Sequence, residues 1–329
     1  MGVPLVYRST SLDPFENLAL ERVLADALRP DEALLYLWRN ARTVVLGRNQ
    51  NAWAECAVEA LEADGGHLAR RPSGGGAVFH DVGNLNFTFA SSVDDYSLER
   101  NLEVVRSAVA GFGIDARLSG RNDVTVDGMK FSGNAFFRSR GVQVHHGTLM
   151  VDVDTSLLGR YLNPDVRKLQ AHGVASVRSR VVNLASLNAR ITIDALSEAL
   201  CDAFAKSRGA AARPFPSARL EEDALQDACA HFASWEWRFG SARPFTDVVE
   251  GRFSWGGVEF RLNVVRGSIE SADVVSDALD AAYVEQLARS VCGIPYLPAA
   301  WREALAAVEA ADGDQALMRA DCERLLSGA

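Results

Sequence analysis

The sequence predicts an α+β fold, in which a mainly antiparallel sheet carries packed helices, followed by a small second α+β domain. Strand-like segments dominate residues 67–153, with one helical segment near 98–111 among them. Helical segments with one apolar face precede and follow this region. A doubly wound fold would instead alternate strands with helices. The length of 329 residues suits one large domain and a smaller one.

The first helix is predicted from its N-terminal residues. Asp13 is a typical cap, Pro14 suits the first helical position, and Glu16 completes a capping box. Apolar residues then recur at helical spacing at Phe15, Leu18, Ala19, Val23 and Ala27. Strands at 34–38 and 43–47 follow, and then a helix at 57–63 that ends at the glycines of 65–66.

The central region is predicted to form strands with tight turns. Residues 84–89 alternate polar and apolar side chains, as a half-buried strand does. Asp127-Gly128 is a two-residue hairpin signal between strand-like segments at 124–126 and 129–132. A long strand is expected at 142–153.

The remaining chain is predicted to contain helices and one meander. Helices are expected at 194–206, 221–232, 281–291, 299–310 and 315–326, and strands at 252–255, 258–265 and 268–275, with turns at 256–257 and 266–267. We place a domain boundary near residue 245, which gives domains 1–245 and 246–329.

Composition excludes several classes of protein. The hydrophobic fraction of 48% and the charged fraction of 23% are ordinary for a globular protein. The chain has no apolar run long enough to cross a membrane, and its N-terminus lacks a signal sequence, so we expect a cytoplasmic protein without membrane contact. The net charge of −9 argues against nucleic-acid binding. The five cysteines show no CxxC spacing, which disfavours disulfide and zinc sites.

A glycine-rich segment is the first candidate site. Residues 70–81 read RRPSGGGAVFHD, and three consecutive glycines let the backbone approach a ligand closely. Successive N–H groups can form an anion-binding concavity, and the planar guanidinium of Arg71 suits phosphate oxygens. The spacing matches neither a P-loop nor a dinucleotide fingerprint, and the glycines alone also fit a plain loop.

A strand lysine and two histidines are the other candidates. Lys130 stands between apolar residues and before Ser132-Gly133, which suits a lysine in a cleft, although an exposed strand lysine fits equally. Asp123 is either a magnesium ligand or a turn residue. His145 and His146 would face opposite sides of a strand, so they do not share one metal.

Together these segments resemble the lipoate–protein ligase A family. The resemblance rests on RRPSGGGAVFHDVGNLNFTF, GRNDVTVDGMKFSGNA, HHGTLMVDVD, YLNPDVRKLQAHGVASVRSRVVNL, SWEWRFG and FSWGGVEF, and it extends from residue 13 to about 277. It implies a ligase that activates lipoate with Mg-ATP to lipoyl-AMP. The lipoyl group then passes to a lysine of apo lipoyl domains, either on E2 subunits of 2-oxoacid dehydrogenases or on the glycine cleavage H protein.

The resemblance also assigns residues. The positions matching the family's ATP-binding residues are Arg71, Gly76, Ala77, Val78, Phe79 and Lys130. Lys130, with Gly75 and His146, is expected to contact lipoate, and Lys130 is the expected catalytic residue. Asn122 and Asp123 are candidates for positioning magnesium or the adenylate, and Val78, Phe87 and Phe89 for an apolar lipoyl slot. The domain after residue 245 resembles the accessory domain of the family, and its fusion makes a monomer plausible.

Three alternatives remain. A lipoyl or octanoyl transferase of the same fold would not perform ATP activation. Octanoyltransferases of this kind use a cysteine as acyl carrier, and residues 65–200 contain none, which favours an adenylate but leaves open a transferase that accepts preformed lipoyl-AMP. A biotin–protein ligase would carry a GRGRxxR-like loop, which is absent. A non-enzymatic lipoyl-binding module would not explain the arginine and lysine residues.

Overall fold

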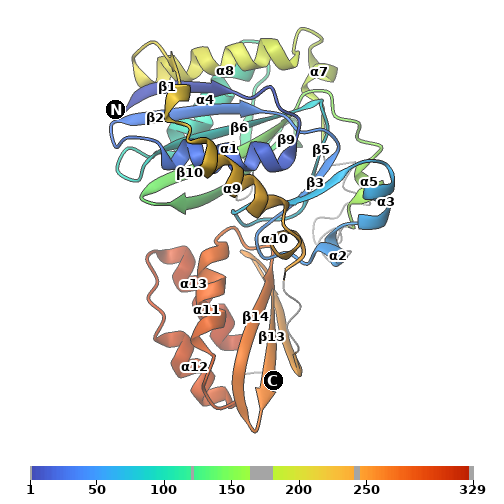
Figure 1. The fold of residues 1–329 in the computed structure, drawn as a ribbon, viewed down its shortest axis with the longest axis vertical. Coiled ribbons are helices and arrows are strands. Elements are labelled where there is room, and N and C mark those ends of the chain that lie inside the picture. Colours follow the sequence, from blue (N-terminus) through green and yellow to red (C-terminus); the bar gives the residue numbers. More distant parts are fainter. Residues whose placement is uncertain (1, 120–121, 164–180, 241–244, 326–329) are drawn as a thin grey trace. The chain divides into compact units, whose positions relative to one another are not determined.

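The computed structural model describes residues 2–119, 122–163, 181–240 and 245–325 (Figure 1). Gly120 and Arg121, which begin the quoted stretch GRNDVTVDGMKFSGNA, and residues 164–180 of the quoted stretch YLNPDVRKLQAHGVASVRSRVVNL lie outside these ranges. The chain forms two compact units. The large unit contains Met1–Val45, Ala52–Arg70 and Ala77–Arg238, and the small unit contains Leu46–Asn51, Arg71–Gly76 and Phe239–Ala329. Two short segments of the N-terminal region therefore belong to the small unit.

The large unit is built on an eight-stranded sheet. Its strands, in spatial order, are β11 (Arg213–Pro214), β1 (Val3–Arg8), β2 (Glu32–Trp38), β6 (Asn84–Ser92), β10 (Val142–Met150), β9 (Met129–Ser139), β8 (Asp123–Val126) and β7 (Arg117–Ser119). Strand β1 pairs in parallel with β2 and β11, and the other neighbours are antiparallel. This mixed, mainly antiparallel sheet confirms the predicted α+β class.

Helices cover both faces of this sheet (Figure 1). Helices α4 (Leu98–Ala110) and α8 (Ile193–Arg208) pack on one face, and α1 (Pro14–Asp26) and α9 (Glu222–Ala233) on the other. The shorter elements are α2 (Ala52–Glu55), α3 (Val58–Ala63), α5 (Leu158–Tyr161), α7 (Leu184–Leu187), η2 (Ser217–Arg219) and α10 (Trp235–Phe239). None of the described helices is long and apolar enough to span a bilayer.

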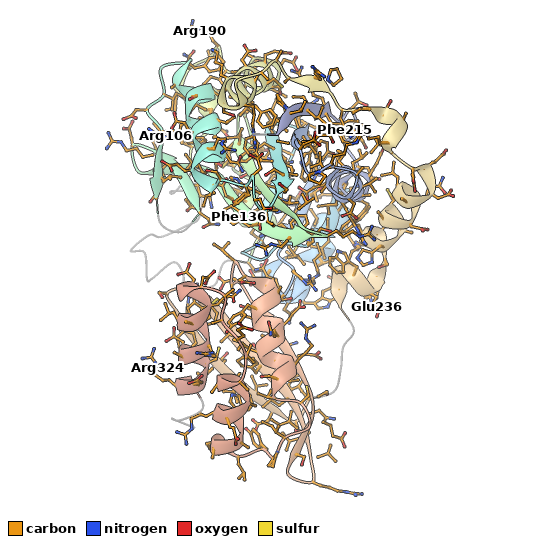
Figure 2. The ribbon with its side chains drawn as sticks, turned by 90° about the vertical axis from the view of Figure 1, so that its left-hand side faces the viewer. Arg106, Phe136, Arg190, Phe215, Glu236 and Arg324 are labelled. Carbon is orange, nitrogen blue, oxygen red and sulfur yellow. The ribbon has the colours of Figure 1, made fainter. Side chains whose placement is uncertain are left out.

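Each face of the sheet has its own core. Phe87, Phe89 and Phe131 lie in the core beneath α4 and α8. Tyr36 and Trp38 lie in the core beneath α1 and α9, where Phe215 (Figure 2) packs edge-on against Tyr7. Strand β6 is therefore buried on both faces, and the prediction that it is half-buried was wrong. The polar side chains of β6 are buried on the face of the sheet that packs against α1 and α9.

Local signals fixed several element ends correctly. The Asp13 carboxylate accepts from the N–H groups of Phe15 and Glu16, which confirms the N-cap of α1. The predicted capping box is wrong, because Glu16 accepts instead from the hydroxyl of Ser11. The Asp127-Gly128 hairpin is confirmed, with φ values of 49° and 78° that match a turn of the primed type.

A second sheet of the large unit carries the ends of the glycine-rich segment. Its strands, in spatial order, are β4 (His67–Arg70), β3 (Thr43–Leu46) and β5 (Val78–His80). Strand β4 leads into the segment and β5 leads out of it. The guanidinium of Arg70 donates to the carbonyls of Trp237 and Arg238, so it secures α10 to this sheet.

The small unit combines a meander with three helices. Its antiparallel strands are β12 (Asp247–Phe253), β13 (Gly256–Val265) and β14 (Ser268–Ser276), and its helices are α11 (Ala281–Ser290), α12 (Pro298–Ala306) and α13 (Gly313–Leu325). Trp255, Phe260 and Trp301 fill its core. The predicted turn at Arg266-Gly267 is confirmed by φ values of 51° and 80°. The first turn falls at 254–255 instead of 256–257, since Gly256 already pairs with Phe253.

Candidate active site

A β-bulge decides which face of the sheet Lys130 occupies. Val124 of β8 pairs with Ser132, but the next residue, Thr125, pairs with Lys130. Phe131 is therefore an extra residue in β9. Its ring enters the core beneath α4 and α8. Because side chains alternate along a strand, the bulge leaves Lys130 on the same face as Gly133, toward α1.

The ammonium group of Lys130 lies over Gly133 and pairs with Asp123. The distance from Nζ to Oδ1 of Asp123 is 2.7 Å, and the two side chains are 33% and 23% exposed. An ideal Cβ on Gly133 would lie 2.9 Å from Nζ and 3.1 Å from Cε of Lys130. The lysine therefore has a defined position that depends on the missing side chain of Gly133.

Asn122 is held tightly to β9 by reciprocal hydrogen bonds. Its Nδ2 donates to the Asn134 carbonyl at 2.6 Å, and its own carbonyl accepts from the backbone N–H and Nδ2 of Asn134, both at 2.9 Å. These bonds tie the start of β8 to β9 next to the Lys130–Asp123 pair. Asn122 thus fixes the backbone beside Asp123.

A row of polar residues continues from Lys130 across the same face. Thr148 accepts from the N–H of Gly133 at 3.1 Å, and His146 is two residues before it on β10. His146 Nδ1 lies 2.8 Å from Oε1 of Glu21, a residue of α1. We call Lys130, Asp123, Thr148, His146, Thr88 and Trp38 the polar row.

Glu21 is the centre of the buried end of the polar row. Its Oε1 also accepts from the Thr88 hydroxyl at 2.6 Å, and that hydroxyl accepts from Nε1 of Trp38 at 3.2 Å. Glu21 is 1% exposed, and its Oε2 has no hydrogen-bond partner among the described residues. Glu21 was not among the site residues predicted from the sequence, although an acidic residue on the apolar face of a predicted helix indicates a buried polar site.

His145 faces the opposite core, as the alternation of side chains predicted. It packs at 4.7 Å from the ring of Phe136 (Figure 2), and its Nε2 is 2.8 Å from Oδ1 of Asn134. Burial lowers the pKa of His145 to about 3, so the ring stays neutral. Phe87 and Phe89 pack against this same ring. They are therefore not on the Lys130 face, contrary to the slot proposed from their sequence.

Within the glycine-rich segment, Arg71–Gly76 belong to the small unit and form the glycine-rich loop. The Arg71 guanidinium donates to the hydroxyl of Ser73 at 3.1 Å, to the carbonyl of Gly74 at 2.7 Å and to that of Gly76 at 2.8 Å. Arg71 is 7% exposed. Gly75 has a φ of 89°, which glycine adopts without strain. The hydrogen bonds from the Arg71 guanidinium therefore hold the loop in its conformation.

Ala77, Val78 and Phe79 lead back into the large unit. Val78 pairs with Val45 of β3 and packs against the core beneath α1. The ring of Phe79 lies 5.5 Å from that of Tyr161. Strand β5 therefore gives the last residues of the glycine-rich segment a rigid support.

Comparisons with known proteins now decide the family. Residues 13–205 match the lipoyl protein ligase A/B catalytic domain, and residues 243–325 match the bacterial lipoate protein ligase C-terminus. The chain is 42% identical over 299 residues to lipoate-protein ligase A of Psychrobacter cryohalolentis, with 88% of each chain covered. The chain belongs to the lipoate–protein ligase A family. Its activity is ATP-dependent lipoate–protein ligation.

Solved structures with bound lipoate or ATP have the same fold. The P. falciparum protein LipL1 in complex with lipoate matches with a TM-score of 0.85 and 28% identity, and the match covers 98% of this chain and 99% of that one. A lipoate-protein ligase A bound with ATP matches with a TM-score of 0.63 and 25% identity, over 73% of this chain and 98% of that one.

The two buried thiols of this lipoate–protein ligase do not resemble an acyl carrier. All five cysteines are free. Cys56 and Cys322 are buried, and burial raises the pKa of their thiols to about 11 and about 12. Cys56 pairs with Leu162 through an isolated antiparallel β-bridge of the backbone. A thiol held protonated is a poor nucleophile.

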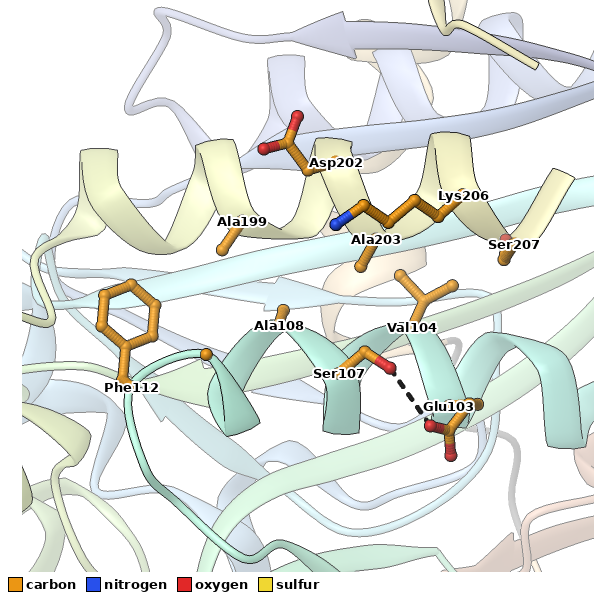
Figure 3. A pocket seen from close by; sticks show the side chains of 11 residues that line it. Glu103, Val104, Ser107, Ala108, Phe112, Ala199, Asp202, Ala203, Lys206 and Ser207 are labelled. Carbon is orange, nitrogen blue, oxygen red and sulfur yellow. Dashed lines mark hydrogen bonds between the residues drawn. The ribbon is translucent and has the colours of Figure 1, made fainter. Parts of the chain in front are cut away.

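The ligase also has a groove on its outer helical surface, between α4 and α8 (Figure 3). Val104, Ala108 and Ala203 form its floor, and Glu103, Asp202 and Lys206 stand at its rim. None of the predicted site residues lines it. The groove lies on the face of the sheet covered by α4 and α8, whereas the side chain of Lys130 lies on the face covered by α1.

Proposed function

We propose that the ligase forms lipoyl-AMP on the Lys130 face of the sheet and then transfers the lipoyl group to a lipoyl domain. An oxygen of the lipoate carboxylate attacks the α-phosphorus of ATP, and pyrophosphate leaves. The ε-amine of the acceptor lysine then attacks the acyl carbon, AMP leaves, and the amine loses a proton. The Lys130–Asp123 ion pair at one end of the polar row is the observation that carries this proposal.

Lys130 acts by charge and position. Its ammonium bridges the lipoate carboxylate and the α-phosphate, which reduces their repulsion and holds the reacting atoms close. It then stabilises the charge that develops on the phosphoryl and acyl oxygens. Asp123 holds the ammonium over Gly133 before substrate arrives. The lysine is never acylated.

Magnesium enters with ATP and is held mainly by the phosphates. Among the described residues, no group of three or more His, Cys, Asp or Glu side chains could hold a metal ion. The Asp123 carboxylate is paired with Lys130, which favours a counter-ion role over a metal-ligand role. A magnesium ion bound through one or two carboxylates and substrate phosphates fits such a sparse donor set. Asn122 supports Asp123 through the backbone.

The buried end of the polar row receives the lipoyl chain. His146, Glu21 and Trp38 close this end, and Oε2 of Glu21 is a buried acceptor without a partner among the described residues. An apolar chain with polarisable sulfur atoms suits the indole of Trp38. Val78 is the remaining member of the slot inferred from the sequence.

The glycine-rich loop binds the nucleotide phosphates through its backbone. The backbone N–H groups from Gly76 to Phe79 are the proposed donors, as the family resemblance implies, whereas the N–H of Gly75 already donates to the Ala278 carbonyl. The bonds of Arg71 to the loop carbonyls support a contribution through loop shape as well as through charge. Truncation of the Arg71 side chain should therefore weaken the binding of ATP more than the binding of lipoate.

The remaining expectations are proposals of the same kind. The acceptors are apo lipoyl domains of 2-oxoacid dehydrogenase E2 subunits or the glycine cleavage H protein. The catalytic domain ends near residue 245, and the ligase acts in the cytoplasm as a monomer without nucleic acid.

One incubation tests the two-step reaction. Purified ligase, lipoate, Mg-ATP and an apo lipoyl domain should give an acceptor whose mass increases by one lipoyl group, and only when ATP is present. A mass gain from preformed lipoyl-AMP but not from ATP and lipoate would favour the transferase alternative. Lys130→Ala should abolish lipoate-dependent exchange of pyrophosphate into ATP, and near-normal exchange would contradict the role of Lys130.

A further inference from the structure

The loop at Leu46–Asn51 is attached to helix α11 by a bidentate ion pair. Nε of Arg48 lies 2.6 Å from Oε1 of Glu285, and Nη2 lies 3.0 Å from Oε2. All of these atoms belong to the small unit. The two residues are 237 positions apart in the sequence. A guanidinium and a carboxylate in this fork geometry fix direction as well as distance.

The same loop is bonded to the glycine-rich loop. The N–H of Arg48 donates to the Ser73 carbonyl at 2.9 Å, and the N–H of Arg71 donates to the Leu46 carbonyl at 3.0 Å. An ideal Cβ on Gly47 would lie only 2.0 Å from the Gly75 carbonyl oxygen. The two loops therefore pack backbone against backbone, and a displacement of Arg48 would displace the glycine-rich loop.

The connection between β14 and α11 also contacts both loops. The N–H of Gly75 donates to the Ala278 carbonyl at 2.9 Å, and the N–H of Ser276 donates to the Asn49 carbonyl at 2.8 Å. An ideal Cβ on Gly74 would lie 2.1 Å from the Ala278 carbonyl oxygen. The middle glycines are thus required partly by the C-terminal segment of the chain, not only by a ligand.

We propose that Arg48 and Glu285 are positioning residues that set the glycine-rich loop for adenylate formation. The inference rests on the proposed role of that loop in binding phosphates. The pair does not contact the reacting atoms. It fixes the position of the glycine-rich loop, and the N–H groups that leave this loop are the proposed contacts to the phosphates. Transfer of a lipoyl group from preformed lipoyl-AMP cleaves no pyrophosphate bond, so it should depend less on this loop.

The pair is suited to a functional test because it contributes little to folding. Its side chains are 37% and 21% exposed, and partly exposed ion pairs usually contribute little to the stability of a protein. Glu285→Gln should leave the thermal midpoint nearly unchanged. It should reduce the kcat of lipoate-dependent pyrophosphate exchange by about tenfold or more, because small displacements of positioned groups are costly.

The experiment compares activation with transfer in the full-length ligase. Pyrophosphate exchange measures activation, and lipoylation of an apo lipoyl domain from preformed lipoyl-AMP measures transfer. Glu285→Gln should lower exchange and leave transfer within about twofold. The double variant Arg48→Glu/Glu285→Arg should recover exchange, because it restores the pair with reversed charges.

A second ion pair of the small unit provides the control. Arg261 and Glu259 are also 2.6 Å apart and are 28% and 29% exposed, but they lie on β13. Glu259→Gln should change neither reaction. The proposal is overturned if Glu285→Gln retains normal exchange, or if exchange and transfer fall together. Absence of exchange in the unaltered protein would instead refute the proposed function.

Discussion

Gly133→Ala should displace Lys130 without altering its charge. The added methyl would lie 2.9 Å from Nζ and 3.1 Å from Cε of Lys130. Non-bonded carbon contacts prefer about 3.5–4.0 Å, so the end of the lysine must move by roughly 0.5–1 Å. That movement disturbs the 2.7 Å contact with Asp123.

The fold should tolerate this change. The atoms that must move are the flexible end of a side chain, and Gly133 is not among the positive-φ glycines. Loss of a partly exposed ion pair costs about 0–1 kcal/mol, while alanine is favoured over glycine in a strand by about 0.5–1 kcal/mol. The two effects roughly cancel. We therefore expect the free energy of unfolding to change by less than about 1 kcal/mol.

Activity should respond much more strongly than stability. A displacement of about 1 Å in a catalytic group typically lowers the rate about 100-fold. The assay is kcat/KM for lipoate-dependent pyrophosphate exchange, measured beside urea unfolding of the same preparation. A folded Gly133→Ala protein with exchange within about twofold of the unaltered ligase would refute the positional role of Gly133.

Gly147→Ala provides the contrasting control. Its methyl would meet Cζ of Phe87 at 2.4 Å and Oδ1 of Asn134 at 2.8 Å. Both neighbours are buried and cannot move aside like the end of a lysine. Overpacking of this kind costs about 1–3 kcal/mol, so here stability should fall together with activity.

Three further predictions concern pH, thiols and the arginine of the glycine-rich loop. The pKa of His145 is about 3 in the folded chain and about 6.5 in the unfolded chain. Between these two values only the unfolded chain binds a proton at His145. The free energy of unfolding should therefore fall by up to about 1.4 kcal/mol per pH unit as the pH drops from 6.5 toward 3. Urea unfolding at pH 7 and pH 5 should show a shallower fall for His145→Gln, and an equal fall would exclude this cause. Replacement of all five cysteines by alanine should preserve ligation, whereas a folded but inactive variant would indicate a covalent acyl carrier. Arg71→Ala frees the Gly74 and Gly76 carbonyls and should raise the KM for ATP more than that for lipoate; an unchanged KM for ATP would contradict the assignment.

The parts of the fold with local chemical signals were predictable from the sequence. The Asp13 cap and the Asp127-Gly128 turn each depend on a few adjacent residues, and both lie where expected. The alternation of His145 and His146 follows from strand geometry alone. The class of the sheet followed from the succession of strands.

The remaining features depend on contacts between distant residues. The bulge at Phe131 is visible only once β8 pairs with β9, and it determines the face that Lys130 occupies. The role of Glu21 required α1 to pack over β10. Phe87 and Phe89 had the alternation expected of pocket residues, but the choice between two buried faces is not encoded in that alternation.

The composition of the small unit from three separate stretches has a consequence for biosynthesis. Large-unit strands up to β10 can pair while the C-terminal half of the chain is still being translated. The glycine-rich loop leaves the ribosome early, yet the carbonyl of Ala278 and the carboxylate of Glu285 that hold it are among the last quarter of residues to be synthesised. A nascent chain therefore contains Lys130 in a paired hairpin before the contacts that hold the glycine-rich loop have been synthesised. From the proposed role of the glycine-rich loop, we expect the ligase to consume ATP only when its synthesis is almost complete.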